Sequence, residues 1–244
     1  MQPSFFIVAV FEFVLLIFAL SFHECAHAWV ASLLGDQTAR MQGRVTLNPA
    51  VHVDPIGTLL FPALVIFGPV FGLHLPFMLV GWAKPTPVIT RNFRKIVRDD
   101  NLVTLAGPCS NLLLALISVI VLVVVSKTTP GGAETALLSF LAAVGQGDPT
   151  MASPVCMLAS LSIVINLSLT FFNLLPIPPL DGSRVVRNLL PYNAVVVYDR
   201  IGGWLSYLLM IFVGGTLMRI TVGPLLGMVF HLLLRLQPAI TTIQ

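Results

Sequence analysis

Long apolar segments dominate this chain and restrict the folds open to it. Charged residues make up 9% of its 244 residues and the mean hydropathy is +0.95, whereas a typical soluble domain is about 25% charged. A helix needs roughly 20 apolar residues to span a bilayer. Six apolar segments occur along the sequence, at residues 5–34, 57–80, 102–126, 158–175, 201–218 and 220–236. We therefore expect an all-α polytopic membrane protein rather than a soluble domain with an anchor.

The segment at residues 57–80 differs from the other five because proline and glycine interrupt it. The interrupting residues are Pro62, Gly68, Pro69, Gly72 and Pro76. A re-entrant hairpin of two half-segments fits such a sequence better than one straight span. We therefore predict about five transmembrane helices plus this hairpin, with a full span as the alternative. Residues 43–47, GRVTL, are predicted to form a short strand and thus a small β element.

Basic residues are concentrated in three of the loops. Loops 35–56, 81–103 and 182–200 hold two, five and three Lys and Arg residues, whereas loop 127–157 holds one. If 57–80 is a hairpin, the three basic loops share one side of the membrane, and the positive-inside rule makes that side cytoplasmic. We therefore expect a multi-pass protein of the cell inner (plasma) membrane. The net charge of +3 follows from these loops and requires no nucleic-acid partner.

Residues 23–27 read HECAH and lie inside the first apolar segment, where ionisable side chains are costly and usually functional. His23 and His27 are four residues apart, so on a helix they share one face, about 5–6 Å apart, and can bind one metal ion. Glu24 would act as general base on a water activated by Zn²⁺, which is the chemistry of H-E-x-x-H metalloproteases. The sequence therefore predicts a zinc hydrolase site at membrane depth.

A catalytic zinc site needs a third protein ligand and an open position for water. The candidates considered for this ligand are Asp54, Asp181, His52, His74 and His231. Asp181 stands out because NLLPIPPLDG follows directly on an apolar segment, and its prolines break the helix and free the carboxylate to turn inward. An ordinary aspartate in an Asp-Gly turn is the alternative. The prolines before Asp181 and the Asp-Gly pair itself are compatible with both alternatives.

Three motifs together resemble the site-2 protease family of intramembrane zinc metalloproteases. They are HECAH at 23–27, AGPCSN at 106–111 and NLLPIPPLDG at 173–182. The resemblance implies one Zn²⁺ per chain held by His23, His27 and Asp181, with Glu24 as the catalytic base. It also implies that Asn173 holds substrate or the developing oxyanion, a role suited to an amide donor; an asparagine that caps the helix end is the alternative.

The activity implied by this resemblance is hydrolysis of peptide bonds in single-span membrane proteins or peptides, within or near the lipid bilayer. Such cleavage belongs to regulated intramembrane proteolysis, and we expect the active site toward the cytoplasmic half of the membrane. The predicted strand at 43–47 is expected near the active site, where it could pair with an extended substrate by edge addition.

The chain also resembles a compact bacterial branch of that family that lacks PDZ and CBS domains. This branch carries an H-x-D-P-x-G stretch, here residues 52–57, whose signature does not say what His52 does. We expect one integral-membrane metalloprotease domain over residues 1–244, with a core at 5–190 and C-terminal helices at 201–236. The sequence leaves open the physiological substrate and whether the chain forms a homo-oligomer.

Three other functions compete with this interpretation. A membrane prenyl-protein protease would take its third ligand from a downstream glutamate, and Glu134, in a loop rich in Gly and Pro, is the only one. A zinc transporter or sensor would need ionisable residues along the later spans, but residues 102–126 and 158–175 hold no charged residue. A catalytically silent membrane-binding partner would keep its function when Glu24 is replaced by Gln.

Overall fold

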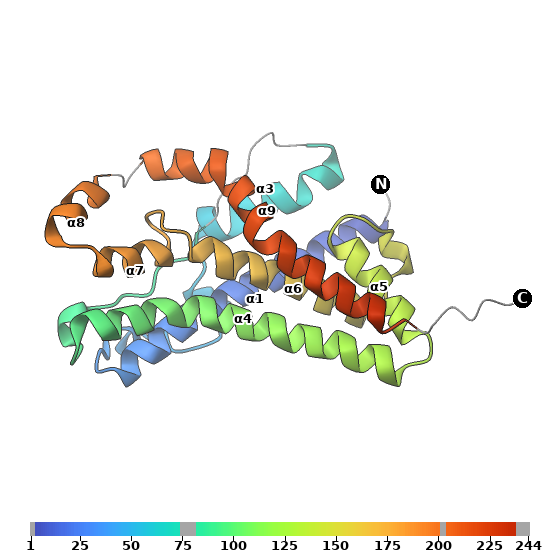
Figure 1. The fold of residues 1–244 in the computed structure, drawn as a ribbon, viewed down its shortest axis with the longest axis horizontal. Coiled ribbons are helices and arrows are strands. Elements are labelled where there is room, and N and C mark those ends of the chain that lie inside the picture. Colours follow the sequence, from blue (N-terminus) through green and yellow to red (C-terminus); the bar gives the residue numbers. More distant parts are fainter. Residues whose placement is uncertain (1–2, 74–81, 201–203, 238–244) are drawn as a thin grey trace, which may run out of the picture.

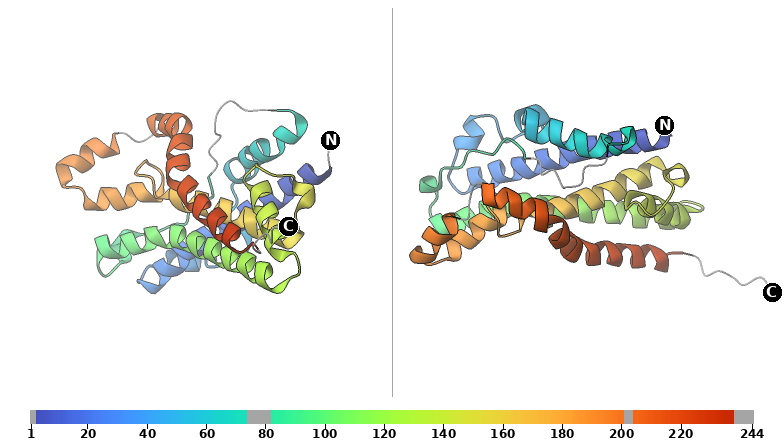
Figure 2. Two further views of the ribbon diagram at one scale, coloured as in Figure 1. Left: turned by 45° about the vertical axis from the view of Figure 1, so that its right-hand side comes forward. Right: turned by 90° about the horizontal axis from the view of Figure 1, so that it is seen from above.

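A computed structural model describes residues 3–73, 82–200 and 204–237 of the chain. Within them, four helices are long and apolar enough to cross a membrane: α1 (Pro3–Leu33), α4 (Ile96–Thr128), α6 (Pro154–Asn173) and α9 (Trp204–Arg235), the last through Phe212–Arg235. Helices α1, α4 and α6 pack against one another, and α9 lies against α6 and α5 (Figures 1 and 2). The prediction of a helical multi-pass membrane protein is therefore confirmed, and three predicted segments coincide with α1, α4 and α6.

Short helices connect and cover these long ones. They are α2 (Thr38–Met41), the 3₁₀ turn η1 (Pro49–Val51), the π-helical turn η2 (Pro55–Leu60), α3 (Phe61–Phe67), the 3₁₀ turns η3 (Pro69–Phe71) and η4 (Thr90–Asn92), α5 (Gly132–Ala143), the 3₁₀ turn η5 (Pro149–Met151), α7 (Asp181–Leu189) and α8 (Tyr192–Asp199). Side-chain caps support several of these turns; Asp54, for example, accepts hydrogen bonds from the backbone N–H groups of Ile56 and Gly57 at the start of η2.

The strand predicted at residues 43–47 is wrong. These residues form a turn and a bend, and the described part of the chain contains no strand. The reason is that the hydrogen bonds of this loop are local. The N–H of Arg44 donates to the carbonyl of Ala39 at 2.9 Å, the Arg44 side chain donates to the carbonyl of Val51, and His52 Nε2 donates to the carbonyl of Thr46 at 2.9 Å. The loop therefore folds around His52 instead of pairing with another strand.

The two C-terminal segments predicted at 201–218 and 220–236 are not separate helices. Residues from Trp204 to Arg235 form the single helix α9, and Arg219, which separates the two predicted segments, lies inside it with an exposed side chain. An arginine has good helix propensity and its long side chain can extend to the surface, so one charge does not end a helix. The predicted count of about five is corrected to four candidate spans within the described residues.

Trp82, which follows the interrupted segment at 57–80 in the chain, lies beside Gly57 at the start of that segment. The N–H of Trp82 donates to the carbonyl of Gly57 at 3.2 Å, and the hydroxyl of Thr58 donates to the carbonyl of Trp82 at 2.8 Å. This contact is compatible with the predicted re-entrant hairpin, but part of its second half lies outside the described residues, so the hairpin stays a prediction. Residues 74–81, which include the candidate ligand His74, lie outside the described residues.

Different loops and short helices lie at the two ends of the helix bundle. The loop after α1, the start of α4, and α7 and α8 lie at one end, whereas α5 and the C-terminal end of α9 lie at the other (Figure 1). An apolar core with wholly buried Leu122, Phe140 and Ile163 joins α4, α5, α6 and α9. The three basic loops predicted to share one side of the membrane therefore do lie at a common end.

Candidate active site

Helix α1 places His23 and His27 one turn apart on its buried face. Their Nε2 atoms lie 3.0 Å apart, and both residues are buried, at 4% and 7% exposed. Such burial is unusual for two ionisable side chains in a span, and it requires a partner for the facing nitrogens. Two imidazole nitrogens aimed at one point are the arrangement that a shared cation requires.

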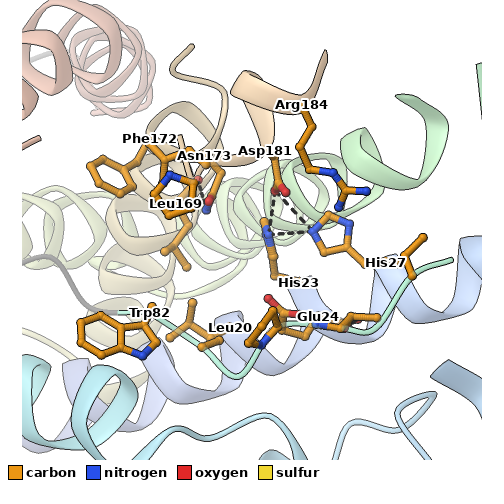
Figure 3. A pocket seen from close by; sticks show the side chains of 16 residues that line it. Leu20, His23, Glu24, His27, Trp82, Leu169, Phe172, Asn173, Asp181 and Arg184 are labelled. Carbon is orange, nitrogen blue, oxygen red and sulfur yellow. Dashed lines mark hydrogen bonds and ion pairs between the residues drawn. The ribbon is translucent and has the colours of Figure 1, made fainter. Parts of the chain in front are cut away.

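Asp181 reaches the same point from the beginning of α7, directly after the turn that follows α6. Its Oδ2 atom lies 3.0 Å from His23 Nε2 and 3.3 Å from His27 Nε2 (Figure 3). One ligand atom from each of the three residues lies within 4.8 Å of the others. A tetrahedral ion with bonds of about 2.0–2.1 Å holds its ligands about 3.3 Å apart, so these residues fit Zn²⁺.

The charge state of Asp181 suits a metal ligand. Burial acts to raise the pKa of its carboxyl, but hydrogen bonds from the ring nitrogens of His23 and His27 outweigh burial and hold that pKa well below its ordinary value. The group is therefore a carboxylate at neutral pH, as metal ligation needs.

A polar network behind the two histidines fixes which ring nitrogen carries the proton. Asn111 Nδ2 donates to Asn166 Oδ1 at 2.9 Å and to the carbonyl of Ala19 at 3.2 Å, so its Oδ1, 2.7 Å from His23 Nδ1, must accept. His27 Nδ1 lies 2.7 Å from the carbonyl of Val103, which can only accept. Both histidines therefore keep a proton on Nδ1, so Nε2, which faces Asp181, is the nitrogen whose lone pair can bind a metal once its own proton is lost.

Gly107 in α4 makes room for this arrangement. A Cβ atom at this position would lie 2.4 Å from His27 Nε2 and 2.6 Å from His23 Nε2. No residue with a side chain can occupy this place while the two imidazoles keep their positions. The glycine of AGPCSN is therefore required by the close approach of α4 to the metal-ligating atoms.

Glu24 faces a cavity of about 360 Å³ that His23, His27 and Asp181 also line (Figure 3). Asn173, the last residue of α6, also lines this cavity, and its Nδ2 donates to the carbonyl of Leu169 at 3.0 Å. The structure thus brings together all five residues singled out from the sequence. The cavity can hold a water and a peptide group beside the three ligand atoms.

The other sequence candidates lie away from this cavity. His52 is buried and donates to the carbonyl of Thr46, Asp54 caps η2, and His231 is exposed beside Phe230. Glu134, the downstream glutamate that a prenyl-protein protease would need, lies in the first turn of α5 and is not among the described residues that line the cavity.

Sequence reasoning missed four residues that shape the site: Gly107, Asn111, Asn166 and Thr86, whose N–H donates to Glu24 Oε2 at 2.9 Å. Gly107 and Asn111 belong to AGPCSN, which served only as a marker of resemblance. This motif places a glycine and an asparagine four residues apart on an apolar helix, and that spacing could have indicated a close helix approach and a buried polar contact. Asn166 and Thr86 left no comparable signal, because each acts through a contact that depends on packing.

Comparison with known proteins decides the family. Residues 11–216 match the model of peptidase family M50. The chain belongs to this family. The matched range runs from α1 into α9, so it contains every residue of the site, and it confirms the resemblance to the site-2 proteases seen in the three motifs.

Curated relatives of this M50 peptidase are named as zinc metalloproteases. YwhC of Bacillus subtilis (strain 168) is 40% identical over 176 residues, which cover 72% of this chain and 67% of YwhC. Rip2 of Mycolicibacterium smegmatis is 29% identical over 67% of this chain and 51% of Rip2. Rip2 of Mycobacterium tuberculosis is 29% identical over 82% of this chain, which spans 65% of that relative. No solved structure matches the chain.

The M50 peptidase described here is accordingly a zinc metalloprotease, a hydrolase whose cofactor is Zn²⁺. Its apolar helices are those of a multi-pass membrane protein.

Proposed function

We propose that this chain hydrolyses peptide bonds of single-span membrane proteins or peptides within or near the bilayer, as in regulated intramembrane proteolysis. His23, His27 and Asp181 would hold one Zn²⁺, with Glu24 as general base. The observation that carries the proposal is that one cavity among apolar, membrane-length helices is lined by all four of these side chains.

His23, His27 and Asp181 would hold Zn²⁺, which would supply acidification of the attacking water and polarisation of the scissile carbonyl. Glu24, which lines the same cavity, takes the proton from the attacking water and returns it to the leaving amine. Asn173 uses one amide hydrogen for the carbonyl of Leu169, which leaves the second for the carbonyl oxygen of the substrate as negative charge develops there. This scheme requires no covalent intermediate.

An adjoining apolar groove supports a membrane-embedded substrate. A second cavity of about 260 Å³ shares Leu20, Leu169 and Phe172 with the first, and its walls are mostly apolar, with Glu12 and Ser168 as the exceptions. A segment that leaves the bilayer could lie here without exposing apolar side chains to water. Because the peptide bonds of a helix are hydrogen-bonded internally, the substrate must unwind locally before the scissile carbonyl enters the first cavity.

The charge distribution supports one orientation. Asp181 begins α7, which lies at the same end of the bundle as the basic loops (Figure 1). The positive-inside rule assigns that end to the cytoplasm, so we infer that the active site opens toward the cytoplasmic half of the inner membrane.

The proposal is tested with purified, zinc-loaded protein in liposomes that also contain synthetic single-span peptides, with cleavage products identified by mass spectrometry. We expect cleavage within or near the apolar segment of a peptide. We expect no cleavage by Glu24→Gln at unchanged zinc content, and normal cleavage by the matched control Glu134→Gln, which alters the first turn of α5. Full activity of Glu24→Gln, or cleavage confined to water-soluble peptides, would contradict the proposal.

A further inference from the structure

An extended segment, residues 82–89, forms one wall of the cavity and is fixed at three points. At its start, the N–H of Trp82 donates to the carbonyl of Gly57 at 3.2 Å, and the N–H of Lys84 donates to the carbonyl of His52 at 2.9 Å. At its end, the N–H of Ile89 donates to Asp36 Oδ2 at 2.7 Å. Figure 3 shows the chain running from Trp82 past Leu20 and Glu24.

Between these anchors, Thr86 contacts the carboxylate of Glu24. The N–H of Thr86 donates to Glu24 Oε2 at 2.9 Å, and its hydroxyl lies 2.8 Å from the same oxygen. The carbonyl of Glu24, at 3.1 Å from that hydroxyl, is the more distant acceptor. Among the described residues both donors serve Oε2 and none serves Oε1, so one carboxylate oxygen is held while the other remains available.

We propose that Thr86 is a positioning residue for Glu24, an inference that rests on the proposed role of Glu24 as general base. A glutamate side chain has three rotatable bonds, and a general base must lie within hydrogen-bond reach of the proton that it takes. Hydrogen bonds to a charged acceptor are strong and directional. The two donors of Thr86 hold Oε2, and the free Oε1 is thereby directed at the attacking water.

The proposal also gives a role to the stretch at residues 52–57, which the metal site does not use. The carbonyl of His52 holds Lys84, and Asp54 caps the turn that carries Gly57. A Cβ on Gly57 would lie 2.4 Å from the ring of Trp82, so the glycine allows segment 82–89 to dock. Residues 52–57 therefore support segment 82–89 in the position in which Thr86 contacts Glu24.

The test uses the full chain, zinc-loaded and in liposomes, with the single-span peptide that the wild type cleaves most readily. Thr86→Val removes the hydroxyl and keeps the shape of the side chain and the backbone N–H; Thr86→Ser keeps the hydroxyl. Thr128→Val is the matched control, because the exposed Thr128 donates only to a carbonyl of its own helix. We expect Thr86→Val to lower kcat about tenfold with KM and zinc content unchanged, and Thr86→Ser to stay within about twofold of the wild type.

A second measurement does not depend on cleavage. The thermal unfolding midpoint is measured for Thr86→Val in the wild-type and in the Glu24→Ala background. We expect the Thr86→Val shift in the wild-type background to disappear in the Glu24→Ala background, because the contact is already lost.

If Thr86→Val shifted the unfolding midpoint equally in the wild-type and the Glu24→Ala backgrounds, the contact between Thr86 and Glu24 would contribute nothing to stability, and the proposal would be overturned. If the midpoint shift of Thr86→Val disappeared in the Glu24→Ala background but its kcat equalled that of the wild type, the positioning role would be overturned. An equal loss of kcat in Thr86→Val and Thr86→Ser would also overturn it. If the wild type cleaved no peptide although the midpoints were coupled, the proposed function would fail and Thr86 would be reduced to a structural contact.

Discussion

Asn111 and His23 are 88 residues apart in sequence, and a 2.7 Å hydrogen bond joins Oδ1 of the asparagine to Nδ1 of the histidine. This bond links α4 to the proposed metal site on α1. Because Asn111 donates from Nδ2 to Asn166 and to the carbonyl of Ala19, it can only accept from His23. The asparagine therefore selects the histidine tautomer that can bind a metal through Nε2.

Replacing Asn111 by Leu should weaken zinc binding without removing a ligand. The loss of an outer partner of a metal-binding histidine typically costs 10- to 100-fold in affinity, and we expect about that range for the zinc dissociation constant. Competition with a fluorescent chelator measures it. Ser126→Ala, on the same helix with a hydroxyl bonded only to the carbonyl of Leu122, is the control and should leave the constant unchanged. Wild-type affinity in Asn111→Leu would show that the tautomer needs no such partner.

Gly107→Ala should abolish zinc binding in a folded protein. The added methyl would occupy space 2.4 Å from His27 Nε2, and neither the helix backbone of α4 nor the imidazole can move away without breaking the site. Zinc content by mass spectrometry, with helix content by circular dichroism, tests this expectation. Gly215→Ala in α9 is the control, because its Cβ would meet nothing within 4 Å. Full zinc occupancy in Gly107→Ala would show that the close approach of α4 to the two histidines does not require a glycine.

Asp36 should stabilise the fold in a pH-dependent way. It is buried and accepts hydrogen bonds from the side chains of Thr38 and Asn92 and from the N–H of Ile89. Burial acts to raise the pKa of its carboxyl, but these hydrogen bonds outweigh burial and lower that pKa below its ordinary value. The carboxylate therefore stabilises the folded state above its unfolded pKa of about 3.9, and this contribution is lost as the pH falls through the lower folded pKa.

We expect Asp36→Asn to lower the free energy of unfolding by about 1–3 kcal/mol at pH 7, because one donor would face the new amide group. The difference from the wild type should narrow below about pH 4. Unfolding curves in detergent at pH 7, 5 and 3 measure it, and Asp199→Asn, which alters an exposed ion pair with Arg187, is the control. A difference that stays constant down to pH 3 would exclude this role of the Asp36 carboxylate.

Part of this site could be predicted from local spacing and part could not. The i, i+4 rule suffices to bring His23 and His27 together. Asp181 is 158 residues from His23, and its local sequence fits a metal ligand and an ordinary turn aspartate equally well. Only the resemblance of whole motifs singled it out as a ligand. Thr86 was beyond prediction, because half of its contact with Glu24 is made by a backbone N–H, which any residue except proline offers.

The fold shows the same division. Segments with about 20 uninterrupted apolar residues predicted α1, α4 and α6, because span length is a local property of the sequence. The strand predicted at 43–47 is absent because the N–H of Arg44 donates to the carbonyl of Ala39 and the carbonyl of Thr46 accepts from His52. A local alternation of residue types says nothing about such partners. The break expected at Arg219 failed because a charge alone does not end a helix.

The most direct test of the central claim is the zinc content of the purified chain beside that of Asp181→Ala. Asp148→Ala is the matched control, because Asp148 only caps the exposed turn η5. We expect about one zinc per chain in the wild type and the control, and a clear loss in Asp181→Ala with helix content unchanged. Full zinc in Asp181→Ala would contradict the three-ligand site, and absence of zinc from the wild type after reconstitution would contradict the metal site altogether.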